Sequence, residues 1–384
     1  MLRIMNRITR RGFLGAGAAA ICAYPQRSAR RLFAYTGCYT TPERYARGDG
    51  IHVWSVDPES AAWTHAQQVG ELVNPSFLTM RRDGRFLYSA HGDESYATAF
   101  AVNAGDGRLT MINRASTGGR NGVHLTLDRA GRFLVVANYG AGTVGVLPVR
   151  ADGGLDDAVQ VVPLPGQPGP HRVEQASSHP HEVVFDPSEK FLVVPDKGLD
   201  RVFVFAFDAA TGKLTPTVQG AGVARSGSGP RHVAFHPRLT LLWVLNEIGN
   251  TVTTWQWEAE RGHLRAVQML PTLPADYAGE NTASEIAVSA DGRFVYCSNR
   301  GHDSIAVFSA DPTTGLLTSI GWTASQGRTP RFLALDSGGR FLYVANEQSD
   351  TIVPFRVDAA RGTLTQAGAV VRNASPVCIA FSPA

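Results

Sequence analysis

The sequence has few of the residues that build metal sites. Its 384 residues include only four cysteines, and no two of them stand in a C-x-x-C pair. Structural zinc sites depend on such paired ligands at short spacing. The sequence therefore predicts no metal site. His179 and His181 would face the same side of a strand, but the proline between them and the lack of other paired ligands argue against a metal there.

Other signatures are missing as well. The chain has no G-x-S-x-G motif and no P-loop motif, so nothing in it suggests a serine-nucleophile hydrolase or an enzyme that uses nucleoside triphosphates. Beyond residue 29 there is no run of about 20 apolar residues that would span a bilayer. Long helical periodicity is absent too, so the sequence favours short strands and tight turns, as its 40 glycines and 22 prolines also indicate.

The first 29 residues differ from the rest. A basic head with paired arginines at positions 10 and 11, followed by Phe-Leu, precedes a short run of small and apolar residues. This pattern is typical of a secretory signal peptide with the twin-arginine export address. We expect residues 1–29 to be a signal peptide recognised by the twin-arginine export machinery. Residues 30–384 would then form one domain in the periplasm, without stable membrane insertion.

The formal charge of the chain depends on the same segment. The whole chain has a charge of +3, but residues 1–29 contain five arginines and no acid. Without these five charges the formal charge is −2. A chain with this formal charge has no overall positive charge with which to bind nucleic acid or anionic lipid. We therefore expect no nucleic-acid partner.

A phrase that reads Gly-Arg-Phe-Leu-Tyr-Val-Ala-Asn recurs six times, in varied form. Its anchors are 47 to 58 residues apart and stand at Phe86, Phe133, Phe191, Leu241, Phe294 and Phe341. Several units end in Asp-x-x-x-Gly-x-Leu, as at 358–364, where Asp and Gly are turn residues. Self-similarity at this period is typical of propeller blades, each of which is a four-stranded sheet.

Six complete units occupy about 74–364, and the remaining residues make a seventh. Residues 32–38 and 51–57 resemble the second and third strands of a unit, and 376–383 resemble the first. The sequence therefore predicts an all-β, seven-bladed β-propeller closed by N- and C-terminal strands that share one blade, which removes free sheet edges. Cys38 and Cys378 would lie in that blade, either as a disulfide or as free buried thiols.

Two sets of positions vary where the strands repeat. The first set enters the first strand of each unit and comprises Ser76, Val123, His181, Arg231, Ser284, Arg331 and Val377. The second set follows the repeated phrase and comprises His91, Tyr139, Lys197, Glu247, Arg300 and Glu347, with Gly37 in the shared blade. The residues before the second set are mostly amides or acids, among them Asn246 and Asn299.

Both sets should lie at the channel-facing ends of inner strands, where ring-shaped proteins place their binding chemistry. Arginines, glutamates and histidines that converge there indicate an anionic ligand and proton transfer. A solvated ladder of channel charges with turn-capping amides would give the same pattern. His124 and His232 follow the first set by one residue, so strand alternation predicts that they pack inside the blades.

Long stretches of the chain resemble the propeller-type lactonase family, which includes bacterial 6-phosphogluconolactonases and fungal carboxy-cis,cis-muconate cyclases. They are residues 178–187, 227–237, 244–247, 298–305 and 329–331. The resemblance covers nearly all of the chain after residue 32. It implies a seven-bladed propeller that needs no metal and no organic cofactor.

The resemblance also implies roles for particular residues. In the muconate-cyclising branch a His, two Arg and a Glu of the channel are implicated. They match His181, Arg231 and Glu247, with Arg300 as the second arginine and Arg331 as its competitor. Our candidate catalytic residues are His181, Glu247, Arg231 and Arg300. The candidates for substrate binding are Arg331, Asn246, Asn299, His91, Lys197 and Glu347.

We therefore expect a lactonase that hydrolyses a small anionic sugar lactone. The arginines would hold the anion and stabilise charge on the carbonyl oxygen, and Glu247 or His181 would take a proton from water. A muconate-type cycloisomerase and a non-catalytic periplasmic binding propeller are the alternatives. The family often has Arg-Gln before the His-Pro-His phrase, whereas this chain has Glu174-Gln175. That difference, together with export, favours a substrate other than a phosphorylated lactone.

Overall fold

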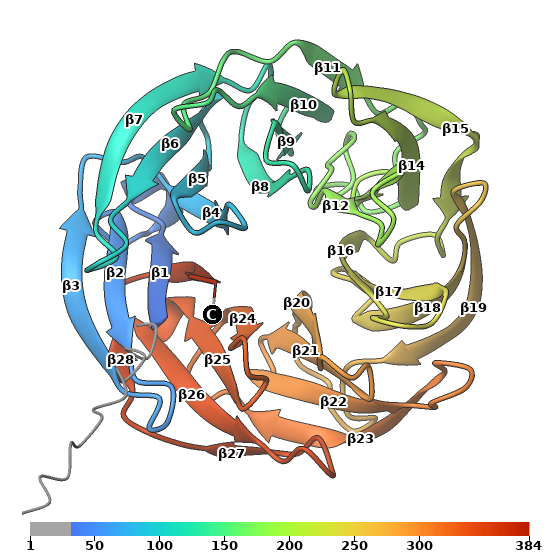
Figure 1. Cartoon of the computed structure of the whole chain (residues 1–384). Coiled ribbons are helices and arrows are strands. Elements are labelled where there is room, and N and C mark those ends of the chain that lie inside the picture. Colours follow the sequence, from blue (N-terminus) through green and yellow to red (C-terminus); the bar gives the residue numbers. More distant parts are fainter. Residues whose placement is uncertain (1–31, 384) are drawn as a thin grey trace, which may run out of the picture. The chain divides into compact units, whose positions relative to one another are not determined.

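The computed structural model describes residues 32–383, so the expected signal peptide at 1–29 lies outside the described residues. The described chain forms seven antiparallel sheets in a ring around a central channel (Figure 1). This confirms the predicted all-β, seven-bladed propeller. No helix within residues 32–383 is long and apolar enough to cross a membrane.

The first three blades, each from its inner to its outer strand, are β29 (Pro376–Phe381), β1 (Leu32–Cys38), β2 (Ile51–Val56) and β3 (Trp63–Val69); β4 (Pro75–Met80), β5 (Phe86–His91), β6 (Tyr96–Val102) and β7 (Leu109–Ser116); and β8 (Gly122–Leu127), β9 (Phe133–Asn138), β10 (Thr143–Pro148) and β11 (Gln160–Pro163).

The fourth and fifth blades are β12 (Val184–Phe185), β13 (Phe191–Asp196), β14 (Arg201–Asp208) and β15 (Lys213–Val223); and β16 (Pro230–Phe235), β17 (Leu241–Asn246), β18 (Thr251–Glu258) and β19 (His263–Pro271). The last two are β20 (Thr282–Val288), β21 (Phe294–Arg300), β22 (Ser304–Ala310) and β23 (Leu317–Ala324); and β24 (Pro330–Leu335), β25 (Phe341–Asn346), β26 (Thr351–Val357) and β27 (Leu364–Gln366), with β28 (Val371–Arg372) also paired to β26. Two short 3-10 helices are η1 (Pro42–Arg44) and η2 (Glu347–Ser349).

The two ends of the described chain meet in one blade, as predicted. Strand β29 pairs antiparallel with β1, with Gly37 opposite Cys378 and Cys38 opposite Pro376. Both cysteines are buried and free, which answers the question that the sequence left open about a disulfide.

The repeated phrase occupies the second strand of six blades. These strands are buried along nearly their whole length, and β17 and β25 are buried throughout, because both of their faces pack against a neighbouring blade. One core cluster, for example, joins Trp243 of β17 to Phe308 of β22. A strand covered on both faces has no polar side, which explains why the phrase is almost continuously apolar instead of alternating.

The Asp-x-x-x-Gly turn of one blade packs against the anchor residue of the blade before it. Gly362 has a φ of +72°, and a Cβ there would lie 2.2 Å from Cδ1 of Phe294. Gly362→Ala is therefore expected to lower the free energy of unfolding by about 2–4 kcal/mol, as backbone strain and overpacking add. Urea unfolding measures this change. The control is Gly339→Ala, whose φ is +64° but whose Cβ would meet nothing within 4 Å; equal losses in the two variants would contradict the packing argument.

The first strand of most blades contains a β-bulge. The pairing register shifts between Pro230 and His232 and, in the same way, between Pro75 and Phe77 and between Pro330 and Phe332. A bulge places two residues opposite one and interrupts strand alternation. Both Arg231 and His232 therefore line the channel. The prediction that His232 packs inside a blade was wrong for this reason, and the ring of His124 lies beside it at 5.7 Å between centroids.

Candidate functional site

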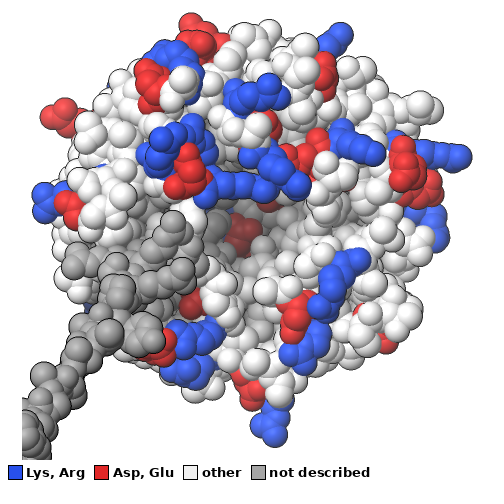
Figure 2. Space-filling model, viewed as in Figure 1, with Lys and Arg blue, Asp and Glu red and all other residues white. Residues whose placement is uncertain are grey.

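A cavity of about 880 Å³ opens where the first and second strands of several blades meet the channel. Figure 2 shows the face hollowed at its centre, with basic side chains on the rim and acidic ones inside. The cationic lining residues are Arg44, Lys197, Arg300, Arg328 and Arg331. The acidic ones are Glu174, Glu247, Glu280 and Asp303. The cationic side chains of the cavity wall can bind an anion, and the carboxylates beside them are available for other contacts.

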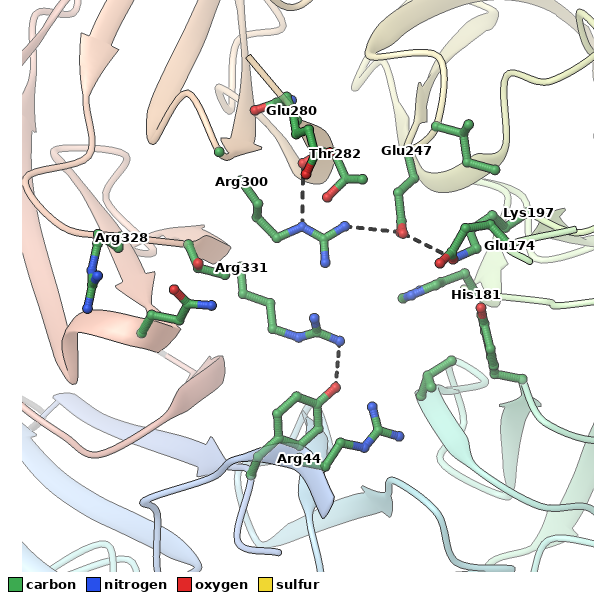
Figure 3. Close-up of a pocket in the computed structure, with 18 of the residues that line it drawn as sticks. Arg44, Glu174, His181, Lys197, Glu247, Glu280, Thr282, Arg300, Arg328 and Arg331 are labelled. Carbon is green, nitrogen blue, oxygen red and sulfur yellow. Dashed lines mark hydrogen bonds and ion pairs between the residues drawn. The ribbon is translucent and has the colours of Figure 1, made fainter. Parts of the chain in front are cut away.

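Glu247 lies at the centre of the charged groups (Figure 3). Its carboxylate oxygens lie 3.1 Å from Nζ of Lys197, 2.8 Å from Nε of Arg231 and 3.2 Å from Nη2 of Arg300. Burial acts to raise the pKa of Glu247, but these three cations together hold it well below its ordinary value. Glu247 is therefore ionised at neutral pH and has little affinity for a proton.

Lys197 contacts two carboxylates. Its Nζ lies 2.5 Å from Oε2 of Glu174 in addition to the contact with Glu247, and it lies 5.3 Å from the centroid of the Tyr139 ring. Burial acts to lower the pKa of Lys197, but Glu247, Tyr139 and Glu174 outweigh it and raise the pKa. Glu174 therefore neutralises part of the positive charge of the cavity.

Two arginines flank the ring of Tyr39 on the opposite wall. The guanidinium carbons of Arg44 and Arg331 each lie 4.9 Å from the ring centroid. Nη2 of Arg331 donates a hydrogen bond of 2.5 Å to the Tyr39 hydroxyl, and Arg44 is paired with Asp93 at 2.7 Å. Arg331 thus has a fixed direction toward the cavity, as Figure 3 shows.

His181 extends into the cavity from the start of the fourth blade (Figure 3). Its ring packs edge-on to Tyr139, and its Nδ1 lies 3.2 Å from Nε2 of His232. Burial, followed by the charges of Arg231 and its other cationic neighbours, lowers the pKa of His181 well below the usual value. The ring is therefore uncharged at pH 7. His179 instead stacks on Tyr139 at 4.3 Å.

The structure brings six of the ten predicted site residues together. His181, Lys197, Glu247, Arg300 and Arg331 line the cavity, and Arg231 lies beneath it in contact with Glu247. Arg231 is only 3% exposed, so its charge acts on the cavity through Glu247. Glu347 lies at the edge, 3.7 Å from Nη1 of Arg331.

Three predicted residues do not reach the cavity wall. Asn246 donates hydrogen bonds to Thr251 and Thr253 in its own blade, and Asn299 donates to the carbonyl of Thr272. Nδ1 of His91 lies 2.7 Å from the carbonyl oxygen of Val73. Asn246 thus binds the next strand of its own blade, whereas Asn299 and His91 bind the loops that lead to Thr272 and Val73, so the structure places none of the three on the cavity wall.

Strand register explains why His91 lies away from the cavity wall. His91 pairs with Pro75 just as Asn246 pairs with Pro230, so it belongs with the amides and not with Glu247. By the same register Cys38 pairs with Pro376, so the member of the second set in the shared blade is Tyr39 and not Gly37. Aligning Cys38 with the amides would have revealed Tyr39, which lines the cavity.

The site contains no cluster suited to a metal ion: within residues 32–383 no group of three or more His, Cys, Asp or Glu side chains has a metal-binding arrangement. Two of the cavity carboxylates, Glu174 and Glu247, are held by lysine and arginine instead. What the arrangement offers is a neutral histidine, a fixed carboxylate and several guanidinium groups around one cavity, which suits proton transfer beside an anion.

Comparisons with known proteins agree with this geometry. Residues 33–381 match the family described as "Lactonase, 7-bladed beta-propeller". A 6-phosphogluconolactonase of Bacillus subtilis is 32% identical over 304 residues, which cover 78% of this chain and 84% of that protein. The periplasmic gluconolactonase of Pseudomonas aeruginosa has a similar structure, with a TM-score of 0.83 and 32% identity over 91% of this chain and 99% of that one.

Proposed function

Since this chain belongs to the lactonase family of seven-bladed β-propellers, we propose that it hydrolyses a small anionic sugar lactone in the cavity around Glu247. The observation that supports this most strongly is the neutral ring of His181 in the same cavity as guanidinium groups. Ester hydrolysis needs both a base for the attacking water and positive charge at the carbonyl oxygen.

His181 takes the proton of the attacking water at Nε2 in this proposal. Glu247 is the weaker candidate, because the three cations around it keep its proton affinity low. Its role is to hold Lys197 and Arg300 in place. Arg300, whose side chain is 14% exposed, stabilises the charge that develops on the carbonyl oxygen. Arg331, directed by Tyr39, holds the anionic group of the substrate.

The test is acid release from freshly made lactones, measured against the spontaneous rate. 6-Phosphogluconolactone, unphosphorylated gluconolactone and a muconolactone are compared, with Arg300→Ala as the control. Acceleration that is lost in this variant supports the proposal and identifies the substrate. Acceleration with the muconolactone alone would favour the cycloisomerase branch. No acceleration by a well-folded protein would favour a non-catalytic binding propeller.

Export to the periplasm through the twin-arginine pathway is part of the proposal. It is supported by the arginine pair and apolar run of residues 1–29 and by the likeness to a periplasmic gluconolactonase. Cell fractionation tests it. An exported enzyme would rarely meet a phosphorylated lactone. The unphosphorylated gluconolactone is therefore the alternative substrate outside the anionic class, and with it Arg331 would bind the carboxylate of the product instead of an anionic group of the substrate.

Glu174 is expected to disfavour a phosphorylated substrate. Glu174→Gln removes one of the two carboxylates that bind Lys197 and makes the cavity more positive. The ratio of kcat/KM for 6-phosphogluconolactone to that for gluconolactone should rise about fivefold, which corresponds to about 1 kcal/mol. The matched control is Glu258→Gln, which removes an exposed carboxylate of β18 paired with His263. An unchanged ratio in Glu174→Gln would contradict this role.

A further inference from the structure

Beneath the cavity lies a second layer of titratable side chains that the proposed reaction does not use. They are His124, Glu182, His232 and Glu285. Each follows a residue of the first variable set by one position, so the four come from the inner ends of four successive blades. All four are at most 8% exposed. Buried imidazoles and carboxylates side by side are costly unless they share protons.

A continuous line of contacts joins this layer to the cavity. Nδ1 of His181 lies 3.2 Å from Nε2 of His232, and Nδ1 of His232 lies 2.7 Å from Oε1 of Glu285. The amide of Ile286 donates to the same Oε1 at 3.0 Å, which fixes the carboxyl group. Within residues 32–383, Oε2 of Glu285 has no hydrogen-bond partner. A buried carboxylate with one unpaired oxygen is a natural place for a proton.

We propose that His232 and Glu285 are positioning residues that exchange a proton with His181 and thereby set whether its ring presents a lone pair or an N–H to the cavity. The inference rests on the proposed function in one respect, because it assigns His181 the role of base. The contacts that carry it are independent of any substrate.

The two states differ by one proton and keep both rings neutral. With Glu285 ionised, His232 donates Nδ1–H to Oε1, His181 donates Nδ1–H to Nε2 of His232, and Nε2 of His181 presents a lone pair. When that lone pair takes a proton from water, the Nδ1 proton of His181 moves to His232. The Nδ1 proton of His232 then moves to Oε1 of Glu285. The line ends with a neutral carboxyl group and Nε2–H of His181 facing the cavity.

Electrostatics favour Glu285 as the final site of the proton. Burial, reinforced by Arg231, lowers the pKa of both histidines well below the usual value. Burial raises the pKa of Glu285 to about 8, although Arg231 and the amide of Ile286 oppose it. The charged and titratable groups around Glu285 come from several elements and are Arg231, His232, Arg331, Glu182, Cys297 and Cys378.

The direction of the pH dependence follows from this arrangement. Below the pKa of Glu285 its carboxyl group is protonated, and His181 presents N–H and cannot act as a base. Above that pKa the carboxylate forms and His181 presents its lone pair. The kcat of the wild-type protein should therefore rise with pH through about 8.

Glu285→Gln tests the line of contacts. Its carbonyl oxygen can still accept from Ile286 and from His232, but it does not titrate, so the rise of kcat near pH 8 should disappear. With no group to take the proton, the plateau of kcat should fall about tenfold or more, while KM changes little. The matched control is Glu182→Gln, a neighbouring buried carboxyl group that contacts His124 at 3.5 Å. It can shift the midpoint but should keep the rise of kcat with pH and the height of the plateau. A Glu285→Gln profile equal to that of the wild type would overturn the proposal.

A second measurement needs neither substrate nor variant stability. Histidine nitrogen NMR of the wild-type protein, with His181 assigned through His181→Gln, reports which ring nitrogen carries the proton. We expect Nε2 of His181 to lose its proton, and Nδ1 to gain one, with a midpoint near pH 8. A single tautomer between about pH 6 and 9 would overturn the inference whatever the activity. A tautomer change without lactone turnover would instead refute the proposed function alone.

Discussion

Replacing His181 by glutamine is expected to lower kcat for lactone hydrolysis by about 10²- to 10⁴-fold, the usual contribution of general acid–base catalysis. KM should change little, since the cavity keeps the guanidinium groups of Arg300 and Arg331. The amide can occupy the space of the ring but cannot take a proton from water. Steady-state kinetics on the lactone that the wild type hydrolyses best measures the effect.

The control for this variant is His179→Gln. His179 is two residues away and stacks on Tyr139, so its replacement perturbs the same segment without removing the proposed base. It should keep kcat within about threefold of the wild-type value. A His181→Gln protein that raises KM at unchanged kcat would show that His181 binds the substrate and transfers no proton.

Glu247→Gln is expected to lower the free energy of unfolding by about 3–5 kcal/mol, because it leaves Lys197, Arg231 and Arg300 buried without their shared counter-charge. Guanidinium chloride or urea unfolding measures the loss. Glu347→Gln is the control: its carboxylate is partly exposed and lies 3.7 Å from Arg331, so it should cost less than about 1 kcal/mol.

The pH dependence of this difference has a definite sign. The folded-state pKa of Glu247 lies below its unfolded value, so its stabilising effect is complete above the unfolded-state pKa of about 4.3 and is lost as the pH falls toward the folded pKa. The wild type and Glu247→Gln should therefore converge in stability in acid. A constant difference down to the lowest pH at which both fold would show that Glu247 acts by packing and not by charge.

The blades could be predicted from the sequence because their second strands are buried on both faces. Burial on both sides allows few residue types, so the same apolar phrase had to recur at each position from Phe86 to Phe341. The gathering of His181, Glu247 and Arg231 could also be predicted, since pseudo-symmetry brings equivalent positions of every blade to one channel.

The second layer of titratable side chains beneath the cavity could not be predicted from the alternation of side chains along a strand. The bulge between Pro230 and His232 adds a residue that no sequence pattern reveals, and it turns His232 from the expected blade interior to the channel. The missed alignment of Tyr39 has a related cause: Cys38 occupies the position of an asparagine, and the amide that binds it, Asn373, comes from the far end of the chain.

The pairing of β29 with β1 has a consequence for the rate at which the ring opens. Each of the other six blades is built from one continuous stretch of chain, but here the inner strand comes from the far end of the described chain and is joined by a hydrogen-bonded strand pair. One further bond joins Phe33 to Ser382, 349 residues apart. A contact of such sequence separation forms slowly during folding. Once formed, this pairing must be broken before the ring can open within the shared blade. The shared blade therefore slows the opening of the ring. The rate of this opening, more than the equilibrium stability, governs resistance to proteolysis and to heat inactivation.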